Sequence, residues 1–209
     1  MKMDFIGIYN LPFGVTILGL WFALWACILS YQDRFELSVI CFVLAGLCDL
    51  FDGVVARRSK RSDEEERFGL YIDSTVDAIS FGFVPIMILL HSGFDTTSDY
   101  FLYAFYCFSA VIRLSYFNLL NDRRQGVSGY YTGLPVTYSA LVLPLVWTIG
   151  LFIPKTLSDV LVRLALFLLA FFFVLKVPIK KPGGVFYIIF PLLGLLLIGF
   201  WIARVFRLI

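Results

Sequence analysis

The stretch CDLFDGVVARRSKRSDEEERFGLYIDSTVD, residues 48–77, places four aspartates and a charged connector beside some of the most apolar sequence in the chain. Asp49 and Asp52 lie near the end of one apolar run, and Asp73 and Asp77 lie near the start of the next. An ionised side chain at the centre of a bilayer costs at least about 2.5–3.5 kcal/mol. The presence of four carboxylates in such surroundings therefore calls for one common explanation, such as a shared function.

The composition of the whole chain is that of a polytopic membrane protein. Of the 209 residues, 60% are hydrophobic and only 15% are charged, which is far outside the range of soluble domains. We expect an all-α integral membrane protein, a helical bundle that forms a single transmembrane domain over residues 1–209. The first apolar run is too long for a cleaved signal peptide, so we interpret it as a helix. With about 20 apolar residues per span, the sequence predicts about seven transmembrane helices, over residues 11–32, 36–56, 68–91, 98–121, 133–153, 158–177 and 184–206.

Basic residues in the short loops indicate the orientation of the chain. If the N-terminus is cytoplasmic, eleven of the seventeen Lys and Arg residues fall on the inner side. We therefore expect a multi-pass protein of the cell membrane with its active site on the cytoplasmic side. The inner basic residues would suit anionic headgroups, or they serve only to set the topology; they are Lys2, Arg57, Arg58, Lys60, Arg61, Arg67, Arg123, Arg124, Lys176, Lys180 and Lys181.

The four aspartates are predicted to share one layer of the membrane. Asp49 lies eight residues before Arg57, and Asp77 lies eight residues after Gly69, where the next span is expected to start. At 1.5 Å per residue, both are about 12 Å from the same surface. The i,i+3 and i,i+4 spacings also place each pair on one helix face.

Divalent cations would offset the repulsion between four such carboxylates. All-oxygen ligation favours Mg²⁺ or Mn²⁺, with Ca²⁺ as a structural substitute, and four ligands suit two ions. Gly53 and Ala56 would let a ligand approach closely, and Arg57 supplies a planar donor suited to phosphate. The alternative treats these residues as helix-packing and topology signals, and the aspartates as a cation or proton relay.

This stretch resembles the signature of the CDP-alcohol phosphotransferase family, D-x-x-D-G-x-x-A-R, a connector, then G-x-x-x-D-x-x-x-D. All eight signature residues match: Asp49, Asp52, Gly53, Ala56, Arg57, Gly69, Asp73 and Asp77. The connector RSKRSDEEERF, residues 58–68, is longer than is usual in the family. Further along the chain, ISFGFVP (79–85), IRLSYFN (112–118) and GLPVTYSA (133–140) resemble the phosphatidylserine synthase branch.

The resemblance implies that a phosphatidyl group passes from CDP-diacylglycerol or CDP-archaeol to L-serine, with CMP leaving, in a protein that forms a homodimer. It implies that the four aspartates hold two divalent cations and that Asp77 is the general base. It also implies a CDP-lipid site lined by Gly53, Ala56, Arg57 and Gly69. The segment YNLPFGVT (9–16) is loosely similar to a family segment near the nucleotide, which adds Asn10 as a candidate.

The acceptor is expected to meet the fourth predicted span. Arg113 lies eight residues from Asn121, so it reaches the aspartate layer and could bind the carboxylate of serine or the lipid phosphate. Asn118 could add a hydrogen bond. A salt bridge from Arg113 to one of the aspartates is the structural alternative.

Two other functions remain open from the sequence. A phosphorylated acceptor, such as glycerol 3-phosphate or inositol phosphate, would need more cationic groups at the depth of Arg113. A cation or proton transporter would need carboxylates deeper in the membrane than one layer. The single histidine, His91, is followed by Ser92, Gly93 and Phe94, which excludes the histidine- and lysine-dependent phospholipase D-like class of phosphatidylserine synthases.

Overall fold

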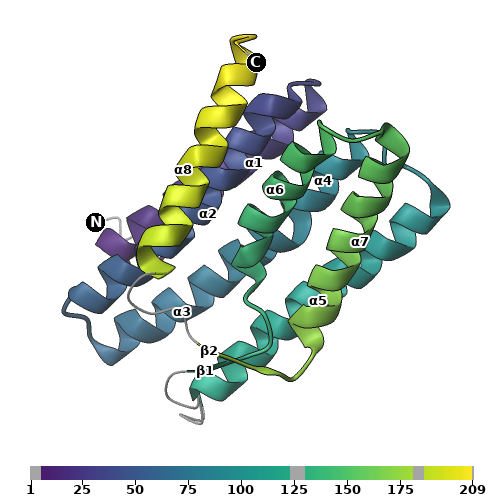
Figure 1. Cartoon of the computed structure of the whole chain (residues 1–209). Coiled ribbons are helices and arrows are strands. Elements are labelled where there is room, and N and C mark those ends of the chain that lie inside the picture. The colour runs from purple at the N-terminus through teal and green to yellow at the C-terminus, as the bar shows by residue number, and fades with distance from the viewer. Residues whose placement is uncertain (1–5, 123–129, 181–185, 209) are drawn as a thin grey trace.

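A computed structural model of the protein is a bundle of helices that stand side by side (Figure 1). It describes residues 6–122, 130–180 and 186–208. Within these ranges, six helical segments are long and apolar enough to cross a membrane, and one further apolar helix is shorter. The predicted all-α, polytopic class is confirmed. The inner-side residues Lys2, Arg123, Arg124 and Lys181 lie outside the described ranges.

The chain begins with a helical hairpin of α1 (Leu11–Tyr31) and α2 (Phe35–Arg58), which pack along each other. Asn10 caps α1, because its Oδ1 accepts a hydrogen bond from the backbone N–H of Phe13 at 3.0 Å. Pro12 in the first turn needs no intrahelical partner for its nitrogen. These two residues fix the point at which α1 begins.

Helix α3 (Asp63–Asp77) begins earlier than the predicted start at residue 68. Ser62 and Glu65 form a capping box: the Ser62 hydroxyl accepts from the Glu65 N–H at 3.3 Å, and the Glu65 carboxylate accepts from the Ser62 N–H at 2.7 Å. The four consecutive acidic residues 63–66 also suit the positive end of the helix dipole. Most of the charged connector is therefore helix, and only residues 59–62 form the loop.

The third span continues through a π-helix, Ala78–Phe83, into α4 (Val84–Leu90). Pro85 has no N–H, so it cannot bond the carbonyl of Phe81 four residues earlier. The hydroxyl of Tyr106 donates to that carbonyl instead, at 2.6 Å. The backbone N–H of Val84 bonds to Ile79, five residues back, which is the π pattern.

Helices α5 (Thr97–Asp122) and α7 (Lys155–Val174) pack against each other and are joined by an ion pair. Arg163 Nε lies 2.7 Å from Asp99 Oδ1, and Arg163 Nη2 lies 3.0 Å from Asp99 Oδ2. The Arg163 guanidinium also lies 5.0 Å from the centre of the Phe94 ring. This pair is far from the aspartate layer in the fold and belongs to the packing of the bundle.

The fifth predicted span, residues 133–153, is shorter than expected. Strand β1 (Tyr130–Thr132) pairs antiparallel with β2 (Pro178–Lys180), with Tyr130 opposite Lys180. A 3₁₀ turn, η2 (Val136–Tyr138), then leads into α6 (Ser139–Gly150). Irregular backbone at membrane depth is tolerated where it lines a cavity within the protein.

Gly133 makes this turn possible. Its φ is +77°, and a Cβ at this position would lie only 2.8 Å from the carbonyl oxygen of Phe173 in α7. The segment before α6 can therefore pass close to the end of α7.

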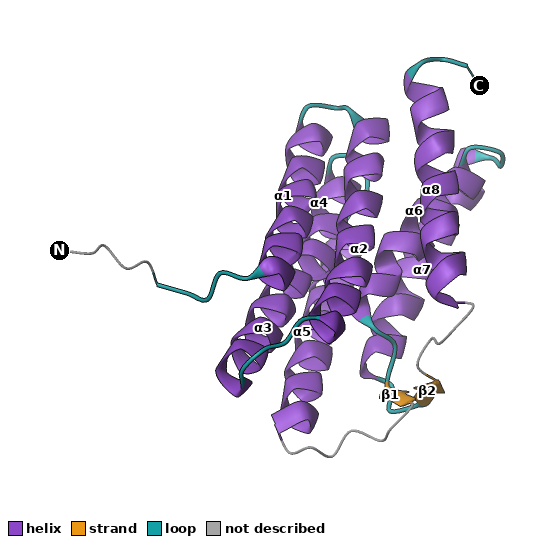
Figure 2. Ribbon diagram, turned by 90° about the vertical axis from the view of Figure 1, so that its left-hand side faces the viewer, coloured by secondary structure: helices purple, strands orange, loops and turns teal. Residues whose placement is uncertain are grey.

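Helix α8 (Phe186–Val205) packs on α2 and α6. The loop between α2 and α3 and the β1–β2 pair lie at one end of the bundle, whereas the described C-terminus lies at the other (Figure 2). The aspartates of α2 and α3 thus lie toward the end that carries the charged connector.

Candidate metal and substrate site

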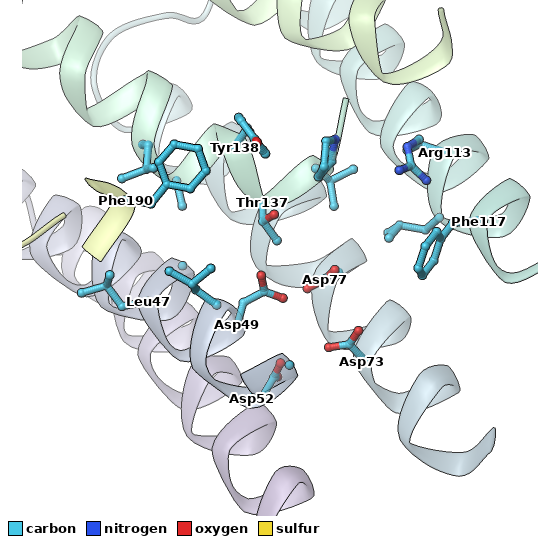
Figure 3. Close-up of a pocket in the computed structure, with 18 of the residues that line it drawn as sticks. Leu47, Asp49, Asp52, Asp73, Asp77, Arg113, Phe117, Thr137, Tyr138 and Phe190 are labelled. Atoms are coloured by element: carbon cyan, nitrogen blue, oxygen red, sulfur yellow. The ribbon is translucent and has the colours of Figure 1, made fainter. Parts of the chain in front are cut away.

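The four aspartates of the opening stretch come together between α2 and α3. Carboxylate oxygens of Asp49, Asp52 and Asp73 lie within 4.8 Å of one another. The Asp77 carboxyl group is in hydrogen-bonding contact with that of Asp49. Figure 3 shows the four side chains directed toward a common centre. The structure thus places in one layer the residues that the helix-rise argument assigned to one depth.

The aspartate cluster suits a divalent cation. Asp52 and Asp77 are only 7% and 8% exposed, and burial of several carboxylates is costly unless a positive charge compensates them. Among the described residues, Oδ1 of Asp73 is buried without a hydrogen-bond partner. Carboxylate oxygens are the ligands that hard cations such as Mg²⁺ prefer, and these lie close enough together to bind one metal ion. The unpartnered Oδ1 of Asp73 is available as such a ligand.

A central cavity of about 300 Å³ opens on one side of the aspartates. Its polar part contains all four aspartates and Arg113 (Figure 3), and Arg57 also lines it. Its other wall is apolar and comes from α2, α6 and α8; it includes Leu47, Leu50, Ala140, Leu141 and Phe190. The cavity therefore joins an ionic region to an apolar one, as a lipid with a charged headgroup requires.

A second, loop-side cavity of about 800 Å³ lies toward the connector between α2 and α3. Pro12 and Phe13 of α1 form part of its wall, and the charged residues of its lining near the connector have both signs: Arg61, Arg67, Asp63 and Glu66. Three residues line both cavities: Asp52, Gly53 and Asp73. The aspartate layer is thus the boundary between two spaces.

The residues that the resemblance assigns to a CDP-lipid site are divided between the cavities. Gly53 lines both, Ala56 and Gly69 line the loop-side cavity, and Arg57 lines the central cavity. Asn10 lines neither, and the structure places it at the N-cap of α1.

The two glycines have a packing role that the structure makes explicit. A Cβ on Gly53 would lie 3.3 Å from Nη1 of Arg57, and a Cβ on Gly69 would lie 3.3 Å from Nη1 of Arg61. Larger side chains at positions 53 and 69 would force these guanidinium groups to move. The absence of a Cβ at these two positions therefore leaves room for the guanidinium groups of Arg57 and Arg61.

The two predicted acceptor residues lie in different environments. Arg113 is 5% exposed and lines the central cavity; its Nε donates to the carbonyl of Leu134 at 3.2 Å, and its guanidinium lies 5.4 Å from the centre of the Phe117 ring. Asn118 lines neither cavity, and its Oδ1 accepts a hydrogen bond from the Ser74 hydroxyl at 2.8 Å. Since Ser74 lies between Asp73 and Asp77 in the sequence, Asn118 holds α3 against α5.

Several cavity residues were not predicted from the sequence. Thr137 and Tyr138 lie in the segment GLPVTYSA, whose pattern predicts a role for neither, and both line the central cavity (Figure 3). Thr16 ends the segment YNLPFGVT, in which the family resemblance indicates only Asn10, and its hydroxyl donates to Asp52 at 2.7 Å. Phe190 of α8 carries no sequence signal beyond its hydrophobicity.

Known proteins resemble the chain over most of its length. A family model described as CDP-alcohol phosphatidyltransferase matches residues 9–206. A CDP-diacylglycerol--serine O-phosphatidyltransferase of Saccharomyces cerevisiae is 38% identical over 52% of the chain and 41% of its own length. An archaetidylserine synthase of Methanothermobacter thermautotrophicus is 27% identical over 68% of the chain and 60% of its own length.

A CDP-diacylglycerol--serine O-phosphatidyltransferase of Methanocaldococcus jannaschii is 32% identical over 62% of the chain and 56% of its own length. The chain thus spans about half the length of the curated relatives it matches. The matched region includes the four aspartates, because the family model extends across both α2 and α3.

Proposed function

This chain belongs to the CDP-alcohol phosphatidyltransferase family, and we propose that it transfers the phosphatidyl group of a CDP-activated lipid to L-serine. CMP is the second product, and the lipid product is phosphatidylserine or archaetidylserine. The observation that carries the proposal is the aspartate layer at the boundary of two cavities, one of which contains a buried arginine and an apolar wall. The names of the relatives favour serine over other acceptors.

The donor fits across the aspartate layer. We assign the cytidine part to the loop-side cavity, where Ala56 and Gly69 leave room. The diphosphate then lies beside the four carboxylates. The lipid part extends into the central cavity along its apolar wall, which includes Leu47 and Phe190.

Two divalent cations, Mg²⁺ or Mn²⁺, are proposed at Asp49, Asp52, Asp73 and Asp77, with Ca²⁺ as a structural substitute. When bound, they would neutralise the diphosphate and favour the departure of CMP. The protein's contribution is to hold the four carboxylates in one layer before the lipid enters, two of them buried and two half-buried.

The acceptor is assigned to the central cavity. The guanidinium of Arg113 suits the carboxylate of serine, because it is planar and permanently charged. Arg57 and Arg113 are the two cationic groups among the described residues that line this cavity. This small number of cationic groups favours serine over glycerol 3-phosphate or inositol phosphate, which carry a phosphate group.

The proposed reaction is a direct displacement at phosphorus. The serine hydroxyl oxygen forms a bond to the phosphorus that carries the lipid, while the bond from that phosphorus to the CMP oxygen breaks and its electron pair leaves with CMP. Asp77 accepts the hydroxyl proton; it lines the central cavity, where serine is assigned, and not the loop-side cavity. A covalent enzyme intermediate is not needed, because the described lining of the site offers no activated nucleophile.

The setting of this reaction is also part of the proposal. We place the chain in the cell membrane, with the α2–α3 loop and the site on the cytoplasmic side, because the basic residues gather at that end. One domain over residues 1–209 is consistent with the family match over residues 9–206. A homodimer is proposed from the family resemblance.

An acceptor series tests the proposed activity. The detergent-purified chain is incubated with CDP-diacylglycerol or CDP-archaeol and Mg²⁺, and CMP release is measured with L-serine, D-serine, glycerol 3-phosphate, inositol phosphate or no acceptor. We expect L-serine to raise CMP release well above the rate without acceptor. The assignment of serine fails if another alcohol raises the rate while L-serine does not.

A further inference from the structure

We infer that Thr16 is a positioning residue that orients Asp52 for cation binding, an inference that rests on the proposed function of the aspartate layer. Thr16 lies on α1, which contributes none of the four aspartates. Its side chain is 6% exposed, and its Oγ1 lies 2.7 Å from Oδ2 of Asp52 on α2. It is therefore a buried contact from a different helix to a proposed metal ligand.

The hydroxyl proton of Thr16 has two acceptors within reach. Oγ1 lies 3.2 Å from the carbonyl oxygen of Pro12, one helical turn earlier, and 2.7 Å from the Asp52 carboxylate. A hydroxyl donates only one proton, and a charged acceptor forms the shorter and stronger bond. The proton therefore belongs to the bond with Asp52.

This bond fixes the direction of the Asp52 carboxylate. The Gly53 backbone also hydrogen-bonds to Asp52, so donors from two helices hold the group. One carboxylate oxygen of Asp52 lies within 4.8 Å of those of Asp49 and Asp73, and the bond from Thr16 to Oδ2 restricts rotation of the group that carries it. Hydrogen bonds of this kind orient metal ligands, and their loss typically weakens metal affinity about 10- to 100-fold.

The position of Asp52 makes this orientation important for both substrates. Asp52 lines the central and the loop-side cavities, and Thr16 lines the loop-side cavity beside Pro12 and Phe13. A carboxylate free to rotate would alter the boundary between the proposed acceptor and nucleotide spaces. Thr16 thus ties α1 to the layer at which the diphosphate is expected to lie.

A packing role for Thr16 is the alternative, because buried threonines in helices commonly bond the carbonyl four residues back. The chain contains a matched control. Thr148 on α6 donates to the carbonyl of Pro144 at 2.8 Å, which reproduces the Thr-to-Pro bond without an aspartate. Thr148→Val therefore shows how the loss of a threonine-to-proline hydrogen bond alone affects cation affinity and melting temperature.

The test compares Thr16→Val, Thr16→Ser and Thr148→Val in the detergent-purified full chain. Mg²⁺ and Mn²⁺ affinity is measured by calorimetric titration without lipid or serine, and the melting temperature is measured without metal. We expect Thr16→Val to weaken cation affinity about tenfold, and Thr16→Ser and Thr148→Val to stay near the wild type. The rescue by serine separates a hydroxyl role from packing.

Unchanged cation affinity in Thr16→Val would overturn the inference, as would a loss in Thr16→Ser equal to that in Thr16→Val. If Thr16→Val does not fold, Thr16→Ala removes the same hydroxyl with less bulk, and the same tenfold loss is expected. The titration contains no acceptor, so it is independent of the serine assignment: wild-type turnover with another alcohol alone would refute the proposed function and leave this test intact.

Discussion

Arg113 is a buried cation that lines the central cavity, and its surroundings hold it in one orientation. The Leu134 carbonyl accepts from Nε, and the Phe117 ring lies under the guanidinium. Because Leu134 belongs to the irregular segment before α6, the orientation of Arg113 depends on a turn that no helix-period argument could locate. The depth of Arg113 was predictable from its distance to the end of the fourth span, but its partners were not.

Replacement of Arg113 tests its assignment to the acceptor. We expect Arg113→Ala to raise the KM for serine roughly 10- to 100-fold with a smaller effect on kcat, since a hydrogen bond to a charged group is worth about 1.5–3 kcal/mol. Arg113→Lys should recover only part of the loss, because an ammonium lacks the planar fork. Initial rates over a range of serine concentrations give both constants.

Arg34 provides the control for Arg113→Ala, because it is exposed and lies in the turn between α1 and α2. Arg34→Ala should leave both constants unchanged. A selective rise in the KM for the CDP-lipid in Arg113→Ala would contradict the acceptor role and would place Arg113 at the donor phosphate instead.

At the level of single residues, spacing within a helix was predictable and contacts between distant segments were not. The i,i+3 and i,i+4 spacings correctly place the aspartates on facing helix surfaces. Thr16 and Asp52 are 36 positions apart, so nothing in the sequence pattern pairs them. Asn118 likewise bonds Ser74 across 44 positions, which gives it a contact with α3 that the sequence did not indicate.

The π-helix adjoins the site, because it begins at the residue after Asp77. Tyr106 on α5 donates to the Phe81 carbonyl within it and also contacts Ser139, whose hydroxyl bonds to Val136. One buried phenol thus connects the helix that carries Asp77 with the turn that lines the central cavity.

Loss of the Tyr106 hydroxyl should therefore affect both stability and turnover. Tyr106→Phe leaves the Phe81 carbonyl buried without its partner, which costs about 1–3 kcal/mol. We expect a lower melting temperature and a lower kcat, with little change in the KM for serine. Thermal unfolding in detergent and steady-state kinetics measure the two effects.

Tyr100 on the same helix is the matched control, because its side chain is 52% exposed. Tyr100→Phe should change the unfolding free energy by less than about 0.5 kcal/mol. Equal melting temperatures for Tyr106→Phe and the wild type would argue against this account of the π-helix.

Element boundaries show which sequence signals were missed. The capping box of Ser62 and Glu65 was present in the connector, but the charged composition of residues 58–68 favoured a loop. Pro85 was the signal for a disturbance in the third span, because it removes the N–H that Phe81 would need. The hydroxyl of Tyr106 reaches the freed carbonyl, and this tertiary contact has no signal in the local sequence.

At the scale of the whole molecule, hydrophobicity predicted the class and the approximate spans. It overestimated the fifth span, because residues before α6 are apolar yet form a strand and a turn. That irregular segment supplies Pro135, Val136, Thr137 and Tyr138 to the central cavity. The division of the site into two cavities depends on how the helices pack around the aspartates. The sequence pattern does not predict this packing.

The most direct test of the central claim is cation- and serine-dependent product formation in wild-type chain and in Asp49→Asn and Asp73→Asn variants. Serine labelled with ¹⁸O in its hydroxyl group is supplied with CDP-diacylglycerol, and lipid products are identified by mass spectrometry. We predict labelled phosphatidylserine and an equal amount of CMP from the wild type, loss of both with EDTA, and recovery with Mg²⁺. The two variants should remain folded and lose turnover. Product without the label, or near-normal turnover in either variant, would contradict the account.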